Sequence, residues 1–168
     1  AVLLAATTGA RRGELVRLRW DDVDVDAATL TVVAGKTDTA RRTVDVPAST
    51  VAALRAHRKA QAERRLLCGQ AWQDLGLVVD RGDGGPVNPD SLSHAFADIA
   101  ESVGLPNVRL HGLRHGYATA CLRAGVPLKI VSEALGHARS SFTADTYQHV
   151  LPGMGRQAAD AIEATLGD

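Results

Sequence analysis

The sequence is poor in aromatic residues, which make up 4% of its 168 residues, and it holds only two cysteines. Cys68 and Cys121 lie far apart without paired spacing. A disulfide staple is therefore not expected, and both are interpreted as small buried side chains in a reducing compartment. The apolar residues are mostly Ala, Val and Leu, and Gly and Pro fall between runs of helix-favouring residues, which indicates a helix-rich fold.

Net charge is also absent, because 19 Lys and Arg balance 19 Asp and Glu. The net charge therefore gives no support to a nucleic-acid partner, which an excess of positive charge would favour. The basic residues are nevertheless clustered in residues 11–19, 36–42 and 55–65. These clusters have two interpretations: solvated helix faces, or surfaces that bind phosphate.

No hydrophobic run is long enough to span a bilayer. The apolar opening, residues 1–10, has no basic segment before it and runs directly into charged residues, so it is interpreted as a helix of the fold rather than a secretory signal. Because the chain lacks an initiating Met and starts inside this run, we expect a fragment of a longer protein. We expect a cytoplasmic protein without membrane contact.

The 45% hydrophobic content is enough for one core, and the length predicts a single domain. Helical spacing, caps and helix-ending glycines predict helices over residues 1–8, 12–19, 49–67, 89–103, 111–124 and 127–135, from 141 through Tyr147, and over 156–166. Alternation predicts strands at 29–33 and 43–46, joined by a hairpin at 35–38, with a third short strand at 77–79. The expected fold class is α+β, mainly α, with a small three-stranded antiparallel sheet on one side.

Phosphate-binding side chains occupy several of the predicted helix ends. Arg11 follows Thr8-Gly9-Ala10 at a turn between two helices. His111 and Arg114 stand three residues apart, and therefore on one face of a helix start. His137 follows Leu135-Gly136 at a helix end, ten residues before Tyr147. Each residue alone is a weak signal, since an isolated His or Tyr is usually structural.

In this order, the motifs TGxR, a hairpin lysine, HxxRH, LGH and Tyr resemble the tyrosine recombinase (phage integrase) family across nearly the whole chain. The resemblance implies that residues 1–168 form an integrase-like catalytic domain, with a separate N-terminal core-binding domain absent. It also implies six catalytic residues, which are two arginines, a hairpin lysine, two histidines and a tyrosine: Arg11, Lys36, His111, Arg114, His137 and Tyr147. Glu14 resembles an acidic support residue, and His115 the histidine that often follows the second arginine.

These residue types suit the cleavage of a phosphodiester. Attack by a hydroxyl builds negative charge on the phosphate oxygens, which two guanidinium groups match well. Tyr147 has a reference pKa of about 10 and needs cationic neighbours or a base to attack at neutral pH. Lys36 is a candidate to protonate the departing 5′ oxygen. His111 and His137 would bind the phosphate, and one of them would take the tyrosine proton.

The resemblance implies a site-specific recombinase that cuts and rejoins DNA through a covalent 3′-phosphotyrosine intermediate, with no cofactor and no metal. The implied partners are double-stranded DNA and three further copies of the protein, which form a tetramer on DNA, with a monomer when free and possible accessory factors. The resemblance also implies a bacterial or phage-encoded protein associated with the nucleoid. Four further arginines are expected to contact the DNA backbone because they lie near the motifs: Arg12, Arg41, Arg42 and Arg139.

Two alternatives stay open. The first is an integrase-like module that binds DNA without cutting it, against which the intact set of catalytic side chains weighs. The neutral net charge indicates that this fragment alone binds DNA weakly. A metal-dependent hydrolase is suggested by His111 and His115 at i and i+4, with His137 as a third ligand. Gly112 stands where the usual zinc-binding motif has its glutamate, and Arg114 would set a guanidinium against the cation, so the second alternative is the weaker one.

Overall fold

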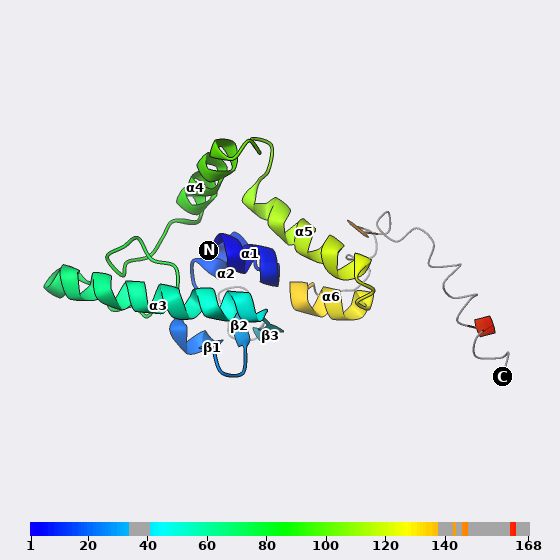
Figure 1. Cartoon of the computed structure of the whole chain (residues 1–168), viewed down its shortest axis with the longest axis horizontal. Helices are drawn as coiled ribbons and strands as arrows, with labels where there is room; N and C mark the ends of the chain where they lie inside the picture. The colour runs from blue at the N-terminus through cyan, green and yellow to red at the C-terminus, as the bar shows by residue number, and fades with distance from the viewer. Residues whose placement is uncertain (34–40, 138–142, 144–145, 148–161, 164–168) are drawn as a thin grey trace.

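The computed structural model describes residues 1–33, 41–137, 143, 146–147 and 162–163 (Figure 1). Its helices are α1 (Val2–Thr8), α2 (Arg12–Leu15), α3 (Ala48–Cys68), α4 (Pro89–Ser102), α5 (Leu110–Arg123) and α6 (Leu128–Leu135). Its strands are β1 (Val23–Asp24), β2 (Thr29–Val33) and β3 (Arg41–Asp45). The mainly helical α+β prediction is confirmed. Within the described part of the chain, no helix is both long and apolar enough to cross a membrane.

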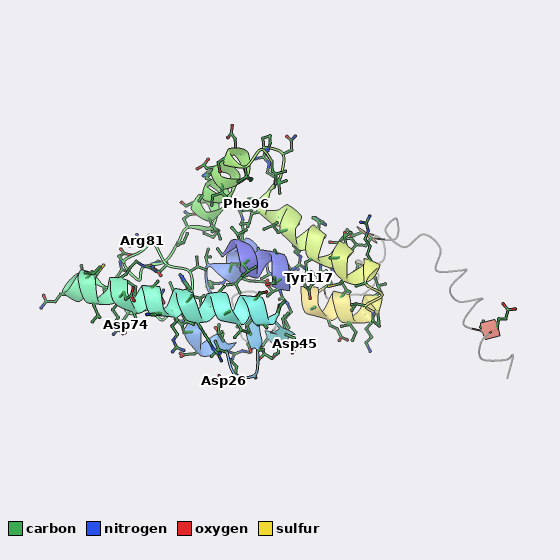
Figure 2. All side chains as sticks on the ribbon, viewed as in Figure 1. Asp26, Asp45, Asp74, Arg81, Phe96 and Tyr117 are labelled. Carbon is green, nitrogen blue, oxygen red and sulfur yellow. The ribbon has the colours of Figure 1, made fainter. Side chains whose placement is uncertain are left out.

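Helix α1 lies at the centre, between α3 and α5 (Figure 1). One apolar cluster joins α1 to the sheet and to α3 and α4, with buried residues such as Leu4, Leu30, Leu54 and Phe96, the last labelled in Figure 2. A second cluster lies between α5 and α6. The side chains described in the next subsection lie mainly on the elements that these two clusters hold together.

Local chemistry explains several element boundaries. Asn88 caps α4, since its side-chain oxygen accepts a hydrogen bond from the Asp90 amide at 2.8 Å, and Pro89 begins the helix. Helices α1 and α6 end at Gly9 and Gly136, with φ of 62° and 65°, a left-handed conformation that glycine adopts at little cost. The predictions for these three ends are confirmed.

The sheet is antiparallel with the order β1-β2-β3, and its register pairs Leu30 with Val44 and Val33 with Arg41. The predicted third strand at residues 77–79 is wrong, because β1 (Val23–Asp24) is the third strand. Leu77 forms only an isolated bridge with Arg19, and Val78 is buried with its amide bonded to the Leu18 carbonyl. A short apolar run predicts burial, but it does not say which backbone pairs with it.

Two helix predictions also need correction. The helix expected over 12–19 ends as α2 at Leu15, and a 3-10 turn follows at Trp20–Asp22. The helix expected over 49–67 begins one residue earlier, as α3 at Ala48, with Pro47 in the cap position. The two helices expected beyond residue 140 fall largely outside the described residues, although Thr143, Thr146 and Tyr147 are helical where they are described.

Candidate active site

The turn between α1 and α2 places Arg11. The hydroxyl of Thr8 is fully buried, donates to the Leu4 carbonyl at 2.6 Å and accepts from the Ala10 amide at 3.2 Å. Gly9 is required next to it, since a Cβ there would lie 2.8 Å from side-chain atoms of both Leu135 and Tyr117. Tyr117 is labelled on α5 in Figure 2. The chain therefore turns sharply and places Arg11 at the N-terminus of α2.

Glu14 fixes the position of Arg11 through two hydrogen bonds. The Glu14 carboxylate accepts from the Arg11 backbone amide at 2.8 Å and from Nη1 of Arg11 at 3.0 Å. The Glu14 side chain is only 3% exposed, whereas that of Arg11 is 42% exposed. Arg11 therefore has a fixed base and a solvent-facing guanidinium that an anion can reach.

Arg42 on β3 makes the second contact with Glu14. Its Nη1 and Nη2 donate to the two carboxylate oxygens at 3.1 and 2.8 Å, and its Nε donates to the Ala134 carbonyl at 2.7 Å. Its side chain is only 10% exposed. The guanidinium thus faces inward and is engaged on all three nitrogens, a geometry that does not favour the DNA-backbone contact expected at Arg42, which stays a prediction.

Burial alone would raise the pKa of Glu14, but the hydrogen bonds from Arg42 and from the Arg11 amide outweigh burial and hold the pKa below its ordinary value. Glu14 is therefore an anion that joins two guanidinium groups. Gly136 makes room for this pair, since a Cβ at that position would lie 2.8 Å from Nη1 of Arg42. The glycine after Leu135 thus serves the site as well as the helix end.

Arg114 on α5 is buried, with 4% of its surface exposed, and it ties three elements together. Its Nη1 donates to the Gly9 carbonyl at 2.6 Å, and its Nη2 donates to the Leu135 carbonyl at 2.7 Å and to Nε2 of His137 at 2.8 Å. Burial first, and then the charge of Arg11, lower the pKa of Arg114 to about 10, so it remains a cation at neutral pH. The guanidinium still has N–H groups on Nε and Nη1 for an anion.

The contact with Arg114 determines the tautomer of His137. A guanidinium only donates hydrogen bonds, so Nε2 of His137 must accept, and the ring proton lies on Nδ1. That nitrogen lies 2.7 Å from the hydroxyl oxygen of Thr143 and donates to it. Burial, followed by the charge of Arg114, lowers the pKa of His137 to about 4, so the ring is neutral at pH 7. Thr143 is fully buried and was not predicted from the sequence.

Tyr147 is 4% exposed, and its hydroxyl lies 2.8 Å from Nδ1 of His115. The rings of His115 and Tyr147 are 5.7 Å apart, and His111 meets His115 edge-on with ring centroids 4.9 Å apart. Burial raises the pKa of Tyr147, and the charge of Arg114 opposes that rise in part. The residue in contact with the tyrosine hydroxyl is thus His115 rather than either histidine expected to take its proton.

The remaining predicted contacts divide into two groups. Arg12 pairs with Asp90 and Arg41 with Asp22, both with 52% of the arginine side chain exposed, so both remain predictions as DNA contacts. Lys36 and Arg139 lie outside the described residues. Among the described residues, no three His, Cys, Asp or Glu side chains are grouped as metal ligands, and the three histidines of the zinc alternative form no such group.

The sequence model for the phage integrase family matches residues 1–153. The chain belongs to the phage integrase family. A tyrosine recombinase XerC-like protein of Caldanaerobacter subterraneus subsp. tengcongensis is 35% identical over 191 residues, which cover 99% of this chain and 48% of that protein. An integrase of Streptomyces ambofaciens is 31% identical over 88% of this chain and 43% of its own length. This phage integrase family chain therefore spans about half the length of the curated relatives it matches.

Solved structures agree with this membership. The crystal structure of XerA recombinase matches with a TM-score of 0.76 and 26% identity, over 94% of this chain and 55% of that one. The Tn1549 transposon integrase in complex with transposon right end DNA matches with a TM-score of 0.76 over 99% of this chain and 58% of that one. At 16% identity, the second match shows the integrase fold alone.

Proposed function

We propose that the protein containing this chain is a site-specific DNA recombinase that cuts and rejoins strands through a 3′-phosphotyrosine. The observation that carries the proposal is the meeting of Arg11, Arg114 and Tyr147 at one place, although the two arginines lie about a hundred residues apart in the sequence. Arg114 donates to the carbonyl of Gly9, two residues before Arg11, and Tyr147 packs in the apolar cluster of the helix that carries Arg114, α5. Membership of the phage integrase family supports the same reaction.

In the proposed reaction, the scissile phosphate binds between Arg11 and Arg114. The phosphate can reach Arg11 from solvent. The buried Arg114 is a cation whose position is fixed by its hydrogen bonds to two carbonyls. Donors that are held in place before reaction need no reorganisation as charge develops on the phosphate, which is why such preorganised cations accelerate phosphoryl transfer. Glu14 and Arg42 do not contact the phosphate in this reaction, and their ion pair fixes the position of Arg11.

The hydroxyl of Tyr147 attacks the phosphorus, and the bond to the 5′ oxygen breaks. The departing oxygen takes a proton, for which Lys36 is the proposed donor. The phosphotyrosine keeps the energy of the broken bond, so a 5′-hydroxyl from another strand can reverse the step and rejoin the DNA without ATP hydrolysis. Double-stranded DNA is thus the proposed partner, bound by a tetramer of the full-length protein in the cytoplasm, with possible accessory factors.

The test is a nicked suicide substrate made from the element's own attachment DNA and incubated with the full-length protein. We expect a covalent protein–DNA band on a denaturing gel, and we expect Tyr147→Phe to abolish it. Tyr117→Phe is the matched control, since Tyr117 is the only other tyrosine and lies on α5. An adduct that persists in Tyr147→Phe would contradict the nucleophile. Absence of any wild-type adduct, with DNA binding retained, would favour the binding-only module.

A further inference from the structure

We propose that His115 is the base that takes the Tyr147 proton during strand cleavage, a step that rests on the proposed function above. Nδ1 of His115 lies 2.8 Å from the hydroxyl oxygen of Tyr147, a distance short enough for proton transfer. His137, one of the two histidines that the family resemblance offers for this role, is committed elsewhere, with Nε2 on Arg114 and Nδ1 on Thr143.

The position of His115 in the fold supports this role. It follows Arg114 on α5, so the buried arginine and the exposed histidine leave the helix on adjacent faces. Tyr147 is buried against α5 and α6, in the same cluster as Ala118 and Leu135. The tyrosine ring thus packs on the apolar side of α5, while its hydroxyl extends to the boundary where His115 meets solvent.

Hydrogen-bond direction gives the protonation state that the role needs. A neutral tyrosine hydroxyl donates to Nδ1 only if that nitrogen carries no proton, so His115 would hold its own proton on Nε2. His111 meets the ring edge-on, and its pKa is lowered by burial and then by the charges of His115, Arg114 and Arg11. A neutral His111 leaves His115 free of an adjacent imidazolium, which favours His115 as the proton acceptor.

The proton moves from the Tyr147 oxygen to Nδ1 of His115, and the phenolate oxygen forms the bond to phosphorus as the bond to the 5′ oxygen breaks. The imidazolium of His115 then keeps that proton beside the phosphotyrosine. When a 5′-hydroxyl attacks in the rejoining step, it gives its proton back to the amine of Lys36. The phosphorus–tyrosine bond breaks, and His115 returns its proton to the tyrosine oxygen.

Among the described residues, three titratable groups interact with His115. They are Tyr147, bonded through its hydroxyl, His111, whose ring meets that of His115 edge-on, and His137, whose pKa the charge of His115 helps to lower. Arg114, the preceding residue on α5, has a pKa of about 10 and keeps its charge across the neutral range. A change in the pH dependence of cleavage on substitution of His115 would therefore report the histidine itself or its tyrosine partner.

The experiment measures single-turnover cleavage of the nicked suicide substrate by the full-length protein as a function of pH. His115→Asn places an amide oxygen near the position of Nδ1, which keeps a hydrogen-bond acceptor but removes the base. We expect cleavage to slow about 100-fold or more, as loss of a general base does, and the rate to go on rising with pH where wild type has levelled off. His94→Asn, at an exposed position on α4, is the matched control.

A second variant separates the base from a structural role. Replacing Tyr147 with 3-fluorotyrosine lowers the pKa of the phenol, so a base is needed less. We expect this replacement to speed cleavage by His115→Asn by a larger factor than it speeds wild type. Equal factors in both backgrounds, or a His115→Asn rate equal to that of wild type, would overturn the proposal. Failure of wild type itself to form an adduct would instead contradict the recombinase function.

Discussion

Arg11 and Arg114 would bind the same phosphate, but their surroundings differ. Arg11 is partly exposed and contacts Glu14, whereas Arg114 is buried and donates to the carbonyls of Gly9 and Leu135. A buried carbonyl that loses its donor costs about 1–3 kcal/mol. We therefore expect substitution of Arg11 to affect the cleavage rate alone, and substitution of Arg114 to lower the free energy of unfolding as well.

We expect Arg11→Ala and Arg114→Ala each to slow cleavage of the suicide substrate by about a hundred- to a thousand-fold, the loss typical of one preorganised donor. Arg114→Ala should in addition lower the free energy of unfolding by at least about 2 kcal/mol, since two carbonyls lose their partner. Arg11→Ala should change it by less than about 1 kcal/mol. Urea unfolding measures this difference, and equal losses of stability would contradict the assigned contacts.

The pair formed by Arg42 and Glu14 gives a second prediction for single residues. Removing one partner of a buried ion pair costs about 3–5 kcal/mol, because the remaining charge is uncompensated. We expect a loss near the lower end for Arg42→Met, since Arg11 still contacts Glu14. Adding Glu14→Leu should recover part of that loss, as a double-mutant cycle would measure.

Arg12→Met is the control for this cycle, because Arg12 pairs with Asp90 at the surface, where both side chains are more than half exposed. Exposed pairs contribute about 0–1 kcal/mol. If Arg42→Met proved as mild as Arg12→Met in urea unfolding, the inward-facing position of Arg42 would be wrong.

At the scale of elements, the helix ends position the chemistry. Gly9 has a φ of 62° and faces Leu135 and Tyr117 across a gap that has no room for a Cβ. Its carbonyl is also the acceptor for Arg114. The glycine thus joins the end of α1 to α5 and α6, and the same three elements carry the arginine-binding carbonyls.

We expect Gly9→Ala to lower the free energy of unfolding by at least about 2 kcal/mol, because the left-handed conformation costs about 1–2 kcal/mol and the added methyl group must displace packed side chains. Gly116→Ala is the matched control, since Gly116 lies inside α5 with open space around it. It should raise stability by about 0.5–1 kcal/mol. Thermal unfolding of both variants tests this, and a shift of the same sign in both would contradict the packing at Gly9.

Element prediction from the sequence succeeded where the signal is local. The cap at Asn88 and the stops at Gly9 and Gly136 are properties of a few adjacent residues, and the structure places all three as expected. The strand expected at 77–79 failed because strand pairing depends on a distant partner. Val23–Asp24 pairs with the edge of β2, whereas the Val78 amide donates to the Leu18 carbonyl outside the sheet.

At the scale of the whole molecule, the charged network makes folding depend on pH. The pKa of His137 is lowered to about 4 in the folded protein, against about 6.5 when unfolded, so the unfolded chain binds more protons between these values. Stability supplied by neutral His137 is present above about pH 6.5 and is lost as the pH falls toward 4. His111, whose pKa is also lowered, acts in the same direction.

We therefore expect the free energy of unfolding to decrease from pH 7 to pH 4. His137→Gln removes one titrating ring and should make this decrease smaller. Urea unfolding at a series of pH values measures the slope. His94→Gln, at an exposed position on α4, is the control and should leave the slope unchanged. A slope unaffected by His137→Gln would mean that burial and the charge of Arg114 do not hold the ring neutral.

The sequence by itself determined the chemical groups and the family: two arginines, a tyrosine and several histidines in an order that resembles the phage integrases, with glycines at the turns that present them. Only the tertiary structure decided which of these groups meet. In the structure, Arg42 faces inward and binds Glu14, and Thr143 contacts His137. His115, rather than His111 or His137, contacts the hydroxyl of Tyr147. Residue types and caps are local properties, whereas contacts across many residues depend on how α1, α5 and α6 pack together.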